Sequence, residues 1–407
     1  MTIAAPTPTI APNPMRTTTT IEAGALALLI CAGGCGKSGD SSPAGSAAPA
    51  GSAAPSSSAS AANAAPSSAL DAPVKAVIAA CSSTWRPGAG FEASCPSFQA
   101  FSALKIPRGA EDTKLAQLLD DPDEKVRSLG ALGLAMWGGA YVSDKPLAAR
   151  IIADAGKETS EAFAGILGNV AGHVDVAATG LGESIKGLVL RDGALQELQA
   201  GVISSFLPSN PASDLAFDLT RDMAKRGPNT RVRNAAVTAL SAVYEKRSDD
   251  VCAIWMDALK APEEAPAANA ASRLTTGASW IGYSQNGWST TTSLPVRDNR
   301  CAKLEGATLA AIEARAKEGR LVEETWVPAL AGLFREDLKS TPAADKTRAL
   351  AIARGLVEKK ENSPTVRGAA LRLLGKKDPQ GPAFAAKFEK DPDVFLKTVA
   401  AEVAKTR

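Results

Sequence analysis

The sequence predicts an all-α fold, an α/α solenoid of stacked helix pairs, on the basis of two observations. The first is composition: aromatic side chains make up only 5% of the 407 residues, and alanine is abundant. This composition suits closely packed helices and is poor for sheets, which favour β-branched and aromatic residues. The second is a helical hydrophobic pattern that recurs along the chain beyond residue 70. A helix pair buries its apolar face only against another pair, so recurring pairs stack.

The recurring pattern is a stripe of five small or apolar residues at positions i, i+3, i+4, i+7 and i+8, which form one face of a helix. In the clear copies a basic residue follows the first position, and a proline two or four residues upstream starts the helix. Four clear copies begin at Val126, Val232, Val366 and Leu396, and two weaker copies begin at Phe163 and Leu195. The starts at 126, 163, 195 and 232 are spaced at 37, 32 and 37 residues, a period typical of helix-pair repeats.

The stretch Leu115–Ala135 resembles a HEAT repeat, with a leucine-rich helix, a turn containing Asp120 to Asp123, and a second helix opening with Val126-Arg127. Arg226–Val243 and Phe388–Ala404 repeat this design, whereas the register is unclear between Leu304 and Lys360. The resemblance implies that turn aspartates and second-helix basic residues form ladders between successive repeats. The residues to which this role carries over are Asp121, Arg127, Arg233, Arg367, Asp391 and Lys397.

The first 35 residues have the pattern of an export signal, with Met15 as a second candidate start. Ala23–Ala32 is an apolar stretch of ten residues, too short for a bilayer that needs about 20. Ala32-Gly33-Gly34-Cys35 then resembles the lipobox of bacterial lipoproteins, which implies that Cys35 becomes a lipidated N-terminus. Gly36 in place of an aspartate favours the outer membrane by the same resemblance. The alternative is ordinary signal-peptidase cleavage that leaves Cys35 unmodified.

Residues 36–70 are expected to form a disordered tether between this anchor and a solenoid at residues 71–407. Apart from Asn63, the segment Ser41–Ala69 contains only serine, alanine, proline and glycine. Such a segment cannot bury enough apolar surface to offset the entropy lost on ordering. The tether therefore holds a folded body away from a membrane.

Four cysteines follow the signal, and an exported compartment permits disulfides between them. Cys81–Cys95 and Cys252–Cys301 are the most economical of the three pairings, because each closes a local segment that is expected to be non-helical. The chain-entropy model gives about 3 kcal/mol for the shorter loop and about 4 kcal/mol for the longer one. The alternative is four buried free thiols.

The segment from about residue 261 to 301 is predicted to be an insertion in the solenoid. The proline-containing stretch Ala261–Ala270 breaks the helical pattern, and Asn286-Gly287 between β-prone runs predicts a β-hairpin. Its aromatic residues Trp280, Tyr283 and Trp288 are candidate binding residues, because rigid aromatics amid serine and threonine suit ligand contact. The alternative is that they pack on neighbouring helices.

Several kinds of chemistry find little support in the sequence. His173 is the only histidine, and we expect it just past a helix end, where it caps a carbonyl. The sequence contains no C-x-x-C pair of the kind that binds a metal. Gly36-Lys37-Ser38 mimics the end of a phosphate-binding loop but lacks its first glycine. The net charge is +2, and the basic residues are not clustered into the basic face that a nucleic-acid-binding protein normally has. We therefore expect no catalytic residues, no cofactor and no metal.

The predicted function is that of a membrane-tethered, non-catalytic binding or scaffold protein of the bacterial cell envelope. It is expected to bind another envelope protein or a peptide on the solenoid, at the outer membrane facing the periplasm or at the cell surface. One alternative is an envelope enzyme, such as a glycan hydrolase with paired carboxylates, and another is a purely structural spacer. These classes differ in whether the surface has a deep cleft with perturbed carboxylates, a binding groove, or neither.

Cys35→Ser is predicted to release the protein from membranes into the soluble fraction, because the acyl chains of a lipoprotein are attached to this cysteine. Fractionation of cells expressing each form measures the release, and intact-mass analysis of the wild type checks the modification. A wild-type N-terminus without lipid at or beyond Cys35 would contradict the prediction.

Overall fold

The computed structural model describes residues 70–86, 90–104, 110–136, 142–277, 280–284, 287–291, 299–334 and 341–405. All of them belong to one compact unit, Ala64–Arg407. The predicted signal, Cys35 and the tether up to residue 69 lie outside the described residues. Within the described part, no helix combines the length and the apolar character needed to cross a bilayer.

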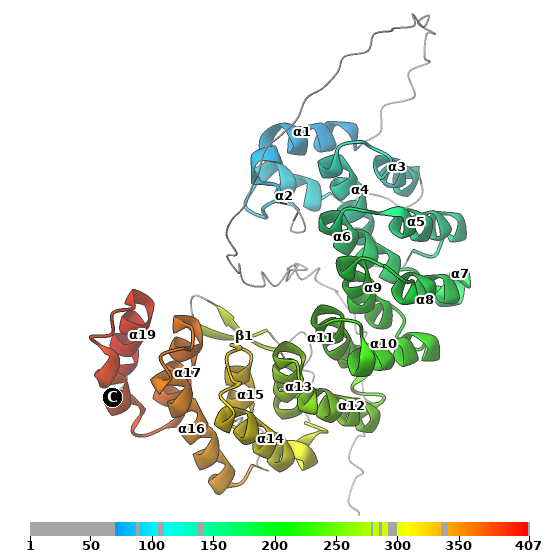
Figure 1. The fold of residues 1–407 in the computed structure, drawn as a ribbon. Coiled ribbons are helices and arrows are strands. Elements are labelled where there is room, and N and C mark those ends of the chain that lie inside the picture. Colours follow the sequence, from blue (N-terminus) through cyan, green and yellow to red (C-terminus); the bar gives the residue numbers. More distant parts are fainter. Residues whose placement is uncertain are drawn as a thin grey trace, which may run out of the picture. The chain divides into compact units, whose positions relative to one another are not determined.

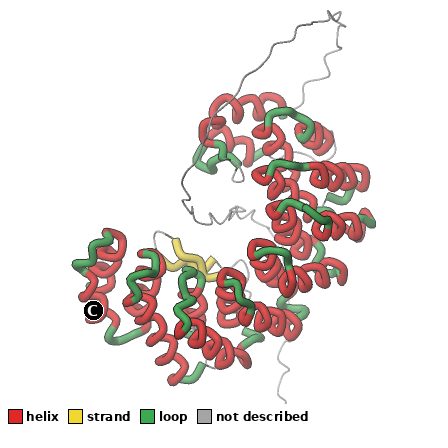
Figure 2. Tube along the Cα trace, viewed as in Figure 1, coloured by secondary structure: helices red, strands yellow, loops and turns green. Residues whose placement is uncertain are grey.

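The described chain is an α/α solenoid of HEAT-like helix pairs, as the sequence predicts (Figures 1 and 2). The first helices of the successive pairs are α3 (Ala110–Leu118), α5 (Lys145–Lys157), α8 (Gly182–Leu190), α10 (Asp214–Arg226), α12 (Ser248–Lys260), α14 (Glu305–Lys317), α16 (Ala343–Glu358) and α18 (Gly381–Ala385). The second helices are α4 (Glu124–Met136), α6 (Glu161–Gly172), α9 (Gln196–Ser209), α11 (Thr230–Ala239), α13 (Glu264–Thr276), α15 (Trp326–Gly332), α17 (Pro364–Lys377) and α19 (Val394–Ala404). Each second helix packs directly on the second helix of the next pair.

Shorter elements complete the described fold. They are α1 (Asp71–Cys81), α2 (Pro96–Ser102), α7 (Val176–Thr179), the 3₁₀ turns η1 (Ser82–Thr84), η2 (Leu240–Val243), η3 (Ala302–Leu304) and η4 (Ala386–Phe388), and the strands β1 (Trp280–Ser284) and β2 (Gly287–Thr291).

Four of the second helices, α6, α11, α17 and α19, begin at a residue whose side chain caps the helix. The Asn229 Oδ1 accepts the Val232 N–H at 2.9 Å, and the Asp393 Oδ1 accepts the Leu396 N–H at 2.9 Å. Each bond satisfies one of the amides that lack a partner in the first turn of a helix. The caps therefore set the register of the hydrophobic stripe that follows them.

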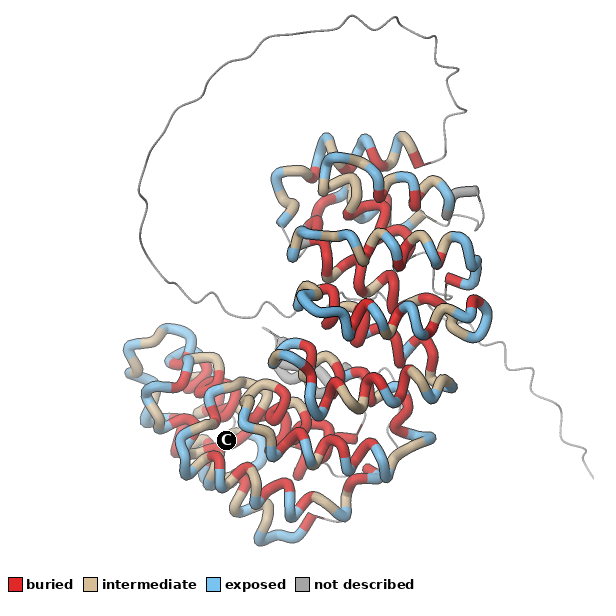
Figure 3. Tube along the Cα trace, turned by 45° about the vertical axis from the view of Figure 1, so that its right-hand side comes forward, coloured by how far each residue is buried: buried red, intermediate tan, exposed pale blue. Residues whose placement is uncertain are grey.

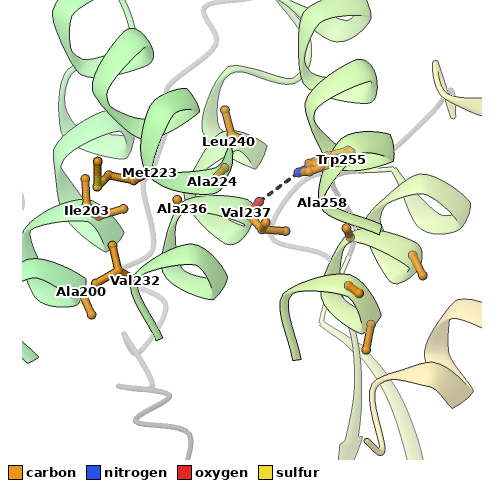
Figure 4. Close-up of a cluster of buried hydrophobic side chains, with 14 of the residues drawn as sticks. Ala200, Ile203, Met223, Ala224, Val232, Ala236, Val237, Leu240, Trp255 and Ala258 are labelled. Atoms are coloured by element: carbon orange, nitrogen blue, oxygen red, sulfur yellow. Dashed lines mark hydrogen bonds between the residues drawn. The ribbon is translucent and has the colours of Figure 1, made fainter. Parts of the chain in front are cut away.

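The predicted stripes form the core. Val232, Ala236 and Leu240 are fully buried, as are the stripe that begins at Val366 and, except for half-buried Ala404, the stripe that begins at Leu396. Figure 3 shows buried residues concentrated where helices face one another. In Figure 4 the same cluster extends to Trp255 of α12, whose indole N–H donates to the Val237 carbonyl at 3.0 Å. The helical periodicity thus predicted the buried face of these helices.

Polar contacts between α6 and α9, and between the residues just past their ends, show the length of one repeat. The Asn169 side-chain amide donates to the Ser205 hydroxyl, and the Asn210 side-chain amide donates to the Val174 carbonyl at 3.0 Å. In both contacts the two residues are 36 positions apart. A constant offset means that neighbouring second helices are related by a shift of one repeat unit.

The ladder implied by the HEAT resemblance forms between some of the repeats. The Arg367 guanidinium of α17 binds the Asp391 carboxylate in the turn before α19 at 3.0 Å, and both side chains are about nine-tenths buried. The Arg233 guanidinium of α11 reaches forward in the same way, but it binds Glu263 at 2.7 Å. Both ion pairs connect a second helix to the turn before the next one.

At the two ends of the series the predicted ladder is wrong. Arg127 donates to the backbone carbonyls of Asp121 and Pro122 at 3.0 Å, and its guanidinium lies 5.3 Å from the centre of the Phe163 ring of the next repeat. The Asp121 carboxylate is used locally, since it accepts the Asp123 N–H at 2.8 Å. Lys397 is exposed on α19, the last described helix.

The predicted break at Ala261–Ala270 is also wrong, because α13 begins at Glu264 and is one of the most buried helices described. Pro266 is its third residue, in the first turn, where an amide N–H has no helical partner to lose. Ala267, Ala268, Ala270 and Ala271 are fully buried. The described insertion therefore begins after α13.

The hairpin is present, with its turn one residue earlier than predicted. β1 and β2 are antiparallel, and Ser284 lies opposite Gly287. Gly287 consequently belongs to β2, and Asn286-Gly287 is not the central pair of the turn. The turn residues 285 and 286 lie outside the described residues.

The four cysteines are paired as their spacing favoured. Cys81 and Cys95 join α1 to the start of α2 with their Cα atoms 6.0 Å apart, beside a small core that contains Phe91 and Phe101. Cys252 of α12 and Cys301 have Cα atoms 5.6 Å apart. Both distances lie within the ordinary range for disulfides. The second bridge closes the segment that contains α13 and the hairpin.

Leu240→Ala is predicted to lower the free energy of unfolding by about 2–5 kcal/mol, because Leu240 is fully buried and its truncation leaves a cavity. Leu190→Ala on α8 is the matched control, since Leu190 is 51% exposed, and its effect is expected to be about 0.5 kcal/mol or less. Urea unfolding followed by circular dichroism measures both. Equal losses would show that the buried face is assigned incorrectly.

Candidate functional site

The candidate site is a groove between the first helices α14 and α16, which we call the α14–α16 groove. It has a volume of about 390 Å³, within the range of ligand-binding clefts. Its lining residues are Glu313, Ala316, Lys317, Gly319, Leu321, Arg348, Ala351, Ile352, Gly355, Leu356 and Lys359. The two helices run in the same direction, because Glu313 meets Arg348 and, further along both helices, Gly319 meets Lys359.

The groove has an apolar lining that combines three large side chains with the small residues Ala316, Gly319, Ala351 and Gly355. Leu321 and Leu356 are nearly fully buried at its base, and Ile352 is half-buried. Above Gly355 there is open space, since a Cβ placed there would meet nothing within 4 Å. The small residues on α14 and α16 therefore leave apolar surface accessible to a ligand.

One end of the groove is fixed by an ion-pair network. The Arg348 guanidinium binds both carboxylate oxygens of Glu313, at 2.8 and 2.5 Å, and the Asp345 carboxylate at 2.9 Å. Hydrogen bonding to Arg348 holds the pKa of Glu313 below its ordinary value, and bonds to Glu313 and Asp345 raise the pKa of Arg348. Glu313 and Arg348 therefore stay charged and hold α14 against α16.

The other end of the groove is basic. Gly319 adopts a φ of +72° just past the end of α14, where the Gly319 N–H donates to the Ala316 carbonyl and the Arg320 N–H donates to the Arg315 carbonyl. This left-handed helix end leaves the Gly319 carbonyl to accept from the Lys359 ammonium at 2.7 Å. Lys317 is exposed beside it. Neither lysine forms an ion pair with any residue that the structure describes.

A smaller groove lies near the other end of the described chain. It has a volume of about 180 Å³ and is lined by residues that include Asp120, Asp154, Lys157, Glu158 and Phe163. Asp120 is paired with Arg150 at 2.5 Å. Its small size makes it a weaker candidate than the α14–α16 groove.

The sequence-predicted binding residues Trp280, Tyr283 and Trp288 lie on the two strands of the hairpin, with Tyr283 opposite Trp288. Their backbone is described and the placement of their side chains lies outside the described structure. Cys35 lies outside the described residues altogether. These predictions remain open.

His173 lies at a helix end, as expected, and its backbone N–H donates to the Asn169 and Val170 carbonyls. It is the C-cap residue of α6, and its Nδ1 lies 2.7 Å from the Ser209 hydroxyl at the end of α9. Ser209 is almost fully buried, and burial lowers the pKa of His173. The pair therefore connects the ends of two neighbouring helices.

No group of three or more metal-binding side chains occurs among the described residues. The carboxylates whose pKa is raised, Glu323 and Glu324, owe this mainly to burial and line neither groove.

No family model matches this chain, and no curated protein matches it. Among solved structures, the chain is similar to the X-ray structure of YibA of E. coli, at 15% sequence identity and a TM-score of 0.41. The match covers 77% of this chain and 98% of YibA. At this level of similarity the comparison transfers no function.

The sequence reasoning missed the α14–α16 groove. Its residues come from Glu313–Leu321 and Arg348–Lys359, within the region where the repeat register is unclear from sequence. The available signal was the pair of helix-end lysines, Lys317 and Lys359, next to small residues at Ala316 and Gly355. Placing them at one site requires knowing which helices are neighbours.

Stability is predicted to fall as the pH drops through about 6.5, partly because of His173. Burial lowers the pKa of His173 in the fold, so the unfolded chain binds a proton at a pH at which the folded chain does not. His173→Gln keeps a group able to bond to Ser209 and removes this titration. Urea unfolding between about pH 5 and pH 7.5 should therefore give a shallower pH dependence in the variant. Identical slopes would contradict the assignment.

Proposed function

We propose that this chain is a lipid-anchored, non-catalytic binding protein of the bacterial cell envelope. In this proposal Cys35 carries the lipid, residues 36–70 are a tether, and the solenoid binds a protein or peptide partner. The lipobox-like sequence Ala32–Cys35 and the pairing of the four later cysteines support export. The outer membrane, facing the periplasm or the cell surface, is the proposed location.

The α14–α16 groove is the observation that carries the binding function. It exposes apolar surface between charged ends, which is the character of a recognition site. Its one carboxylate, Glu313, is held ionised by Arg348, so it cannot serve as the protonated acid of a glycan hydrolase at neutral pH. This chemistry supports binding over hydrolysis.

Quantitative co-purification tests the proposal. The mature chain with its lipid anchor is isolated from detergent-solubilised envelope, and a partner is expected to co-purify in constant stoichiometry after washing. The Cys35→Ser form serves as the control for association through the lipid. Release of new reducing ends from cell-wall glycan by the purified chain would contradict the proposal, as would the absence of any stoichiometric partner.

Replacing Trp280–Trp288 with a Gly/Ser loop is predicted to leave the helical content and the melting temperature nearly unchanged. Solenoid repeats are stabilised by their neighbours, and the hairpin follows α13 as an insertion. Circular dichroism on heating measures both quantities. If the aromatics bind the partner, co-purification falls sharply; an unfolded variant would show instead that they are part of the core.

A further inference from the structure

We propose that the α14–α16 groove binds an acidic amphipathic helix of a partner protein, two to three turns long. This rests on the proposed binding function and adds the class of partner. Three properties of the groove lead to it: its length, the lack of free backbone groups along its walls, and its charge.

The length of the groove matches a short helix. Along α16 the lining extends from Arg348 to Lys359, and along α14 from Glu313 to Gly319. At 1.5 Å per residue these segments measure about 16 Å and about 9 Å. Residues i, i+3, i+4 and i+7 of a bound helix span about 10 Å, so one such apolar stripe fits the floor.

The walls of the groove favour a ligand whose backbone hydrogen bonds are already made. Both walls are α-helices, whose backbone groups are bonded within the helix except at the ends. At the end of α14 the free Gly319 carbonyl is already occupied by Lys359. An extended peptide would find no row of backbone partners here, whereas a helix needs none.

The charge of the groove selects an acidic ligand. Its lining includes three cationic side chains, Lys317, Arg348 and Lys359, against the single carboxylate of Glu313. Glu313 is already paired with Arg348, so Lys317, one turn further along α14, and Lys359 supply the excess positive charge of the groove. Glutamate or aspartate beside the apolar stripe of a ligand would meet these lysines.

The same features disfavour a lipid. The groove is a trough between two helices, and a long acyl chain lying in it would keep much of its surface in water. Each CH₂ group that stays in water fails to contribute about 0.8 kcal/mol of binding free energy. An amphipathic helix does not have this cost, because the face that it leaves in water is polar.

Fluorescence anisotropy with a labelled designed peptide tests the proposal on the full mature chain. The probe carries leucines at i, i+3, i+4 and i+7 with glutamates at the flanking positions. One comparison peptide has the same composition in scrambled order, and another has lysines in place of the glutamates. The glutamate peptide should bind at least about tenfold more tightly than either, and more weakly as salt is raised.

Two variants with matched controls locate the binding. Gly355→Phe fills the open space on α16 and should weaken binding about tenfold or more, whereas Gly187→Phe, at an equally open position on α8, should not. The double variant Lys317→Glu with Lys359→Glu should weaken binding similarly. Its control, Lys75→Glu with Lys397→Glu, changes the net charge by the same amount at exposed positions outside the groove and should leave binding unchanged. Circular dichroism confirms that each variant is folded.

Several outcomes would overturn the proposal. These are no binding of the glutamate peptide, equal binding of the scrambled or lysine peptide, or undiminished binding by folded Gly355→Phe. Displacement of the peptide by laurate, with laurate binding more tightly, would assign the groove to a fatty anion instead. If a partner still co-purifies with Gly355→Phe, the binding function stands and only its placement in this groove fails.

Discussion

The close approach of neighbouring second helices is the constraint on which the rest of the structure depends. It is tightest between α6 and α9, where a Cβ on Gly168 would collide with the Leu198 carbonyl oxygen and a Cβ on Gly201 with the Gly165 carbonyl oxygen. Only glycine allows these backbones to come so near. The short distance brings Asn169 within reach of Ser205, and the same approach aligns the helix ends that His173 and Ser209 join. The close approach of α6 and α9 therefore produces both the buried packing and the polar contacts between these helices.

This arrangement separates the parts of the molecule that carry stability from those available for binding. The second helices pack on one another through buried stripes such as Val366–Leu374. The first helices α14 and α16 meet at the Glu313–Arg348 and Gly319–Lys359 contacts, and the surface between them remains open. A ligand in the α14–α16 groove would contact the first helices without entering the stack of second helices. Binding and folding can thus vary independently.

The sequence predicted those features that depend on local periodicity. The stripes at Val232, Val366 and Leu396 were recognisable because their small and apolar residues recur at helical spacing, and the caps at Asn229 and Asp393 are local as well. The sequence misled at α13, where Pro266 suggests a break although its position in the first turn is compatible with a helix.

The α14–α16 groove could not be predicted, because it depends on contacts between residues about 40 positions apart, such as Gly319 and Lys359. Arg127 shows the same limit at the level of one side chain. Its position matches that of Arg367, yet Arg127 donates to two backbone carbonyls of its own turn, whereas Arg367 binds the Asp391 carboxylate in the turn of the next repeat. The local sequence pattern predicts where a helix forms and which of its faces is buried. The residue that each side chain contacts depends on tertiary packing.

The stability change caused by Gly168→Ala, compared with Gly187→Ala, tests most directly whether close approach of the second helices holds the stack. Alanine favours a helix over glycine by about 1 kcal/mol, so Gly187→Ala, with open space at its Cβ, should stabilise the protein or leave it unchanged. Gly168→Ala should destabilise it despite the same gain in propensity, because α6 and α9 must separate to admit the methyl group. Urea unfolding should therefore give a stability below that of the wild type for Gly168→Ala, and a stability equal to or above that of the wild type for Gly187→Ala. A Gly168→Ala protein as stable as the Gly187→Ala protein would contradict the account.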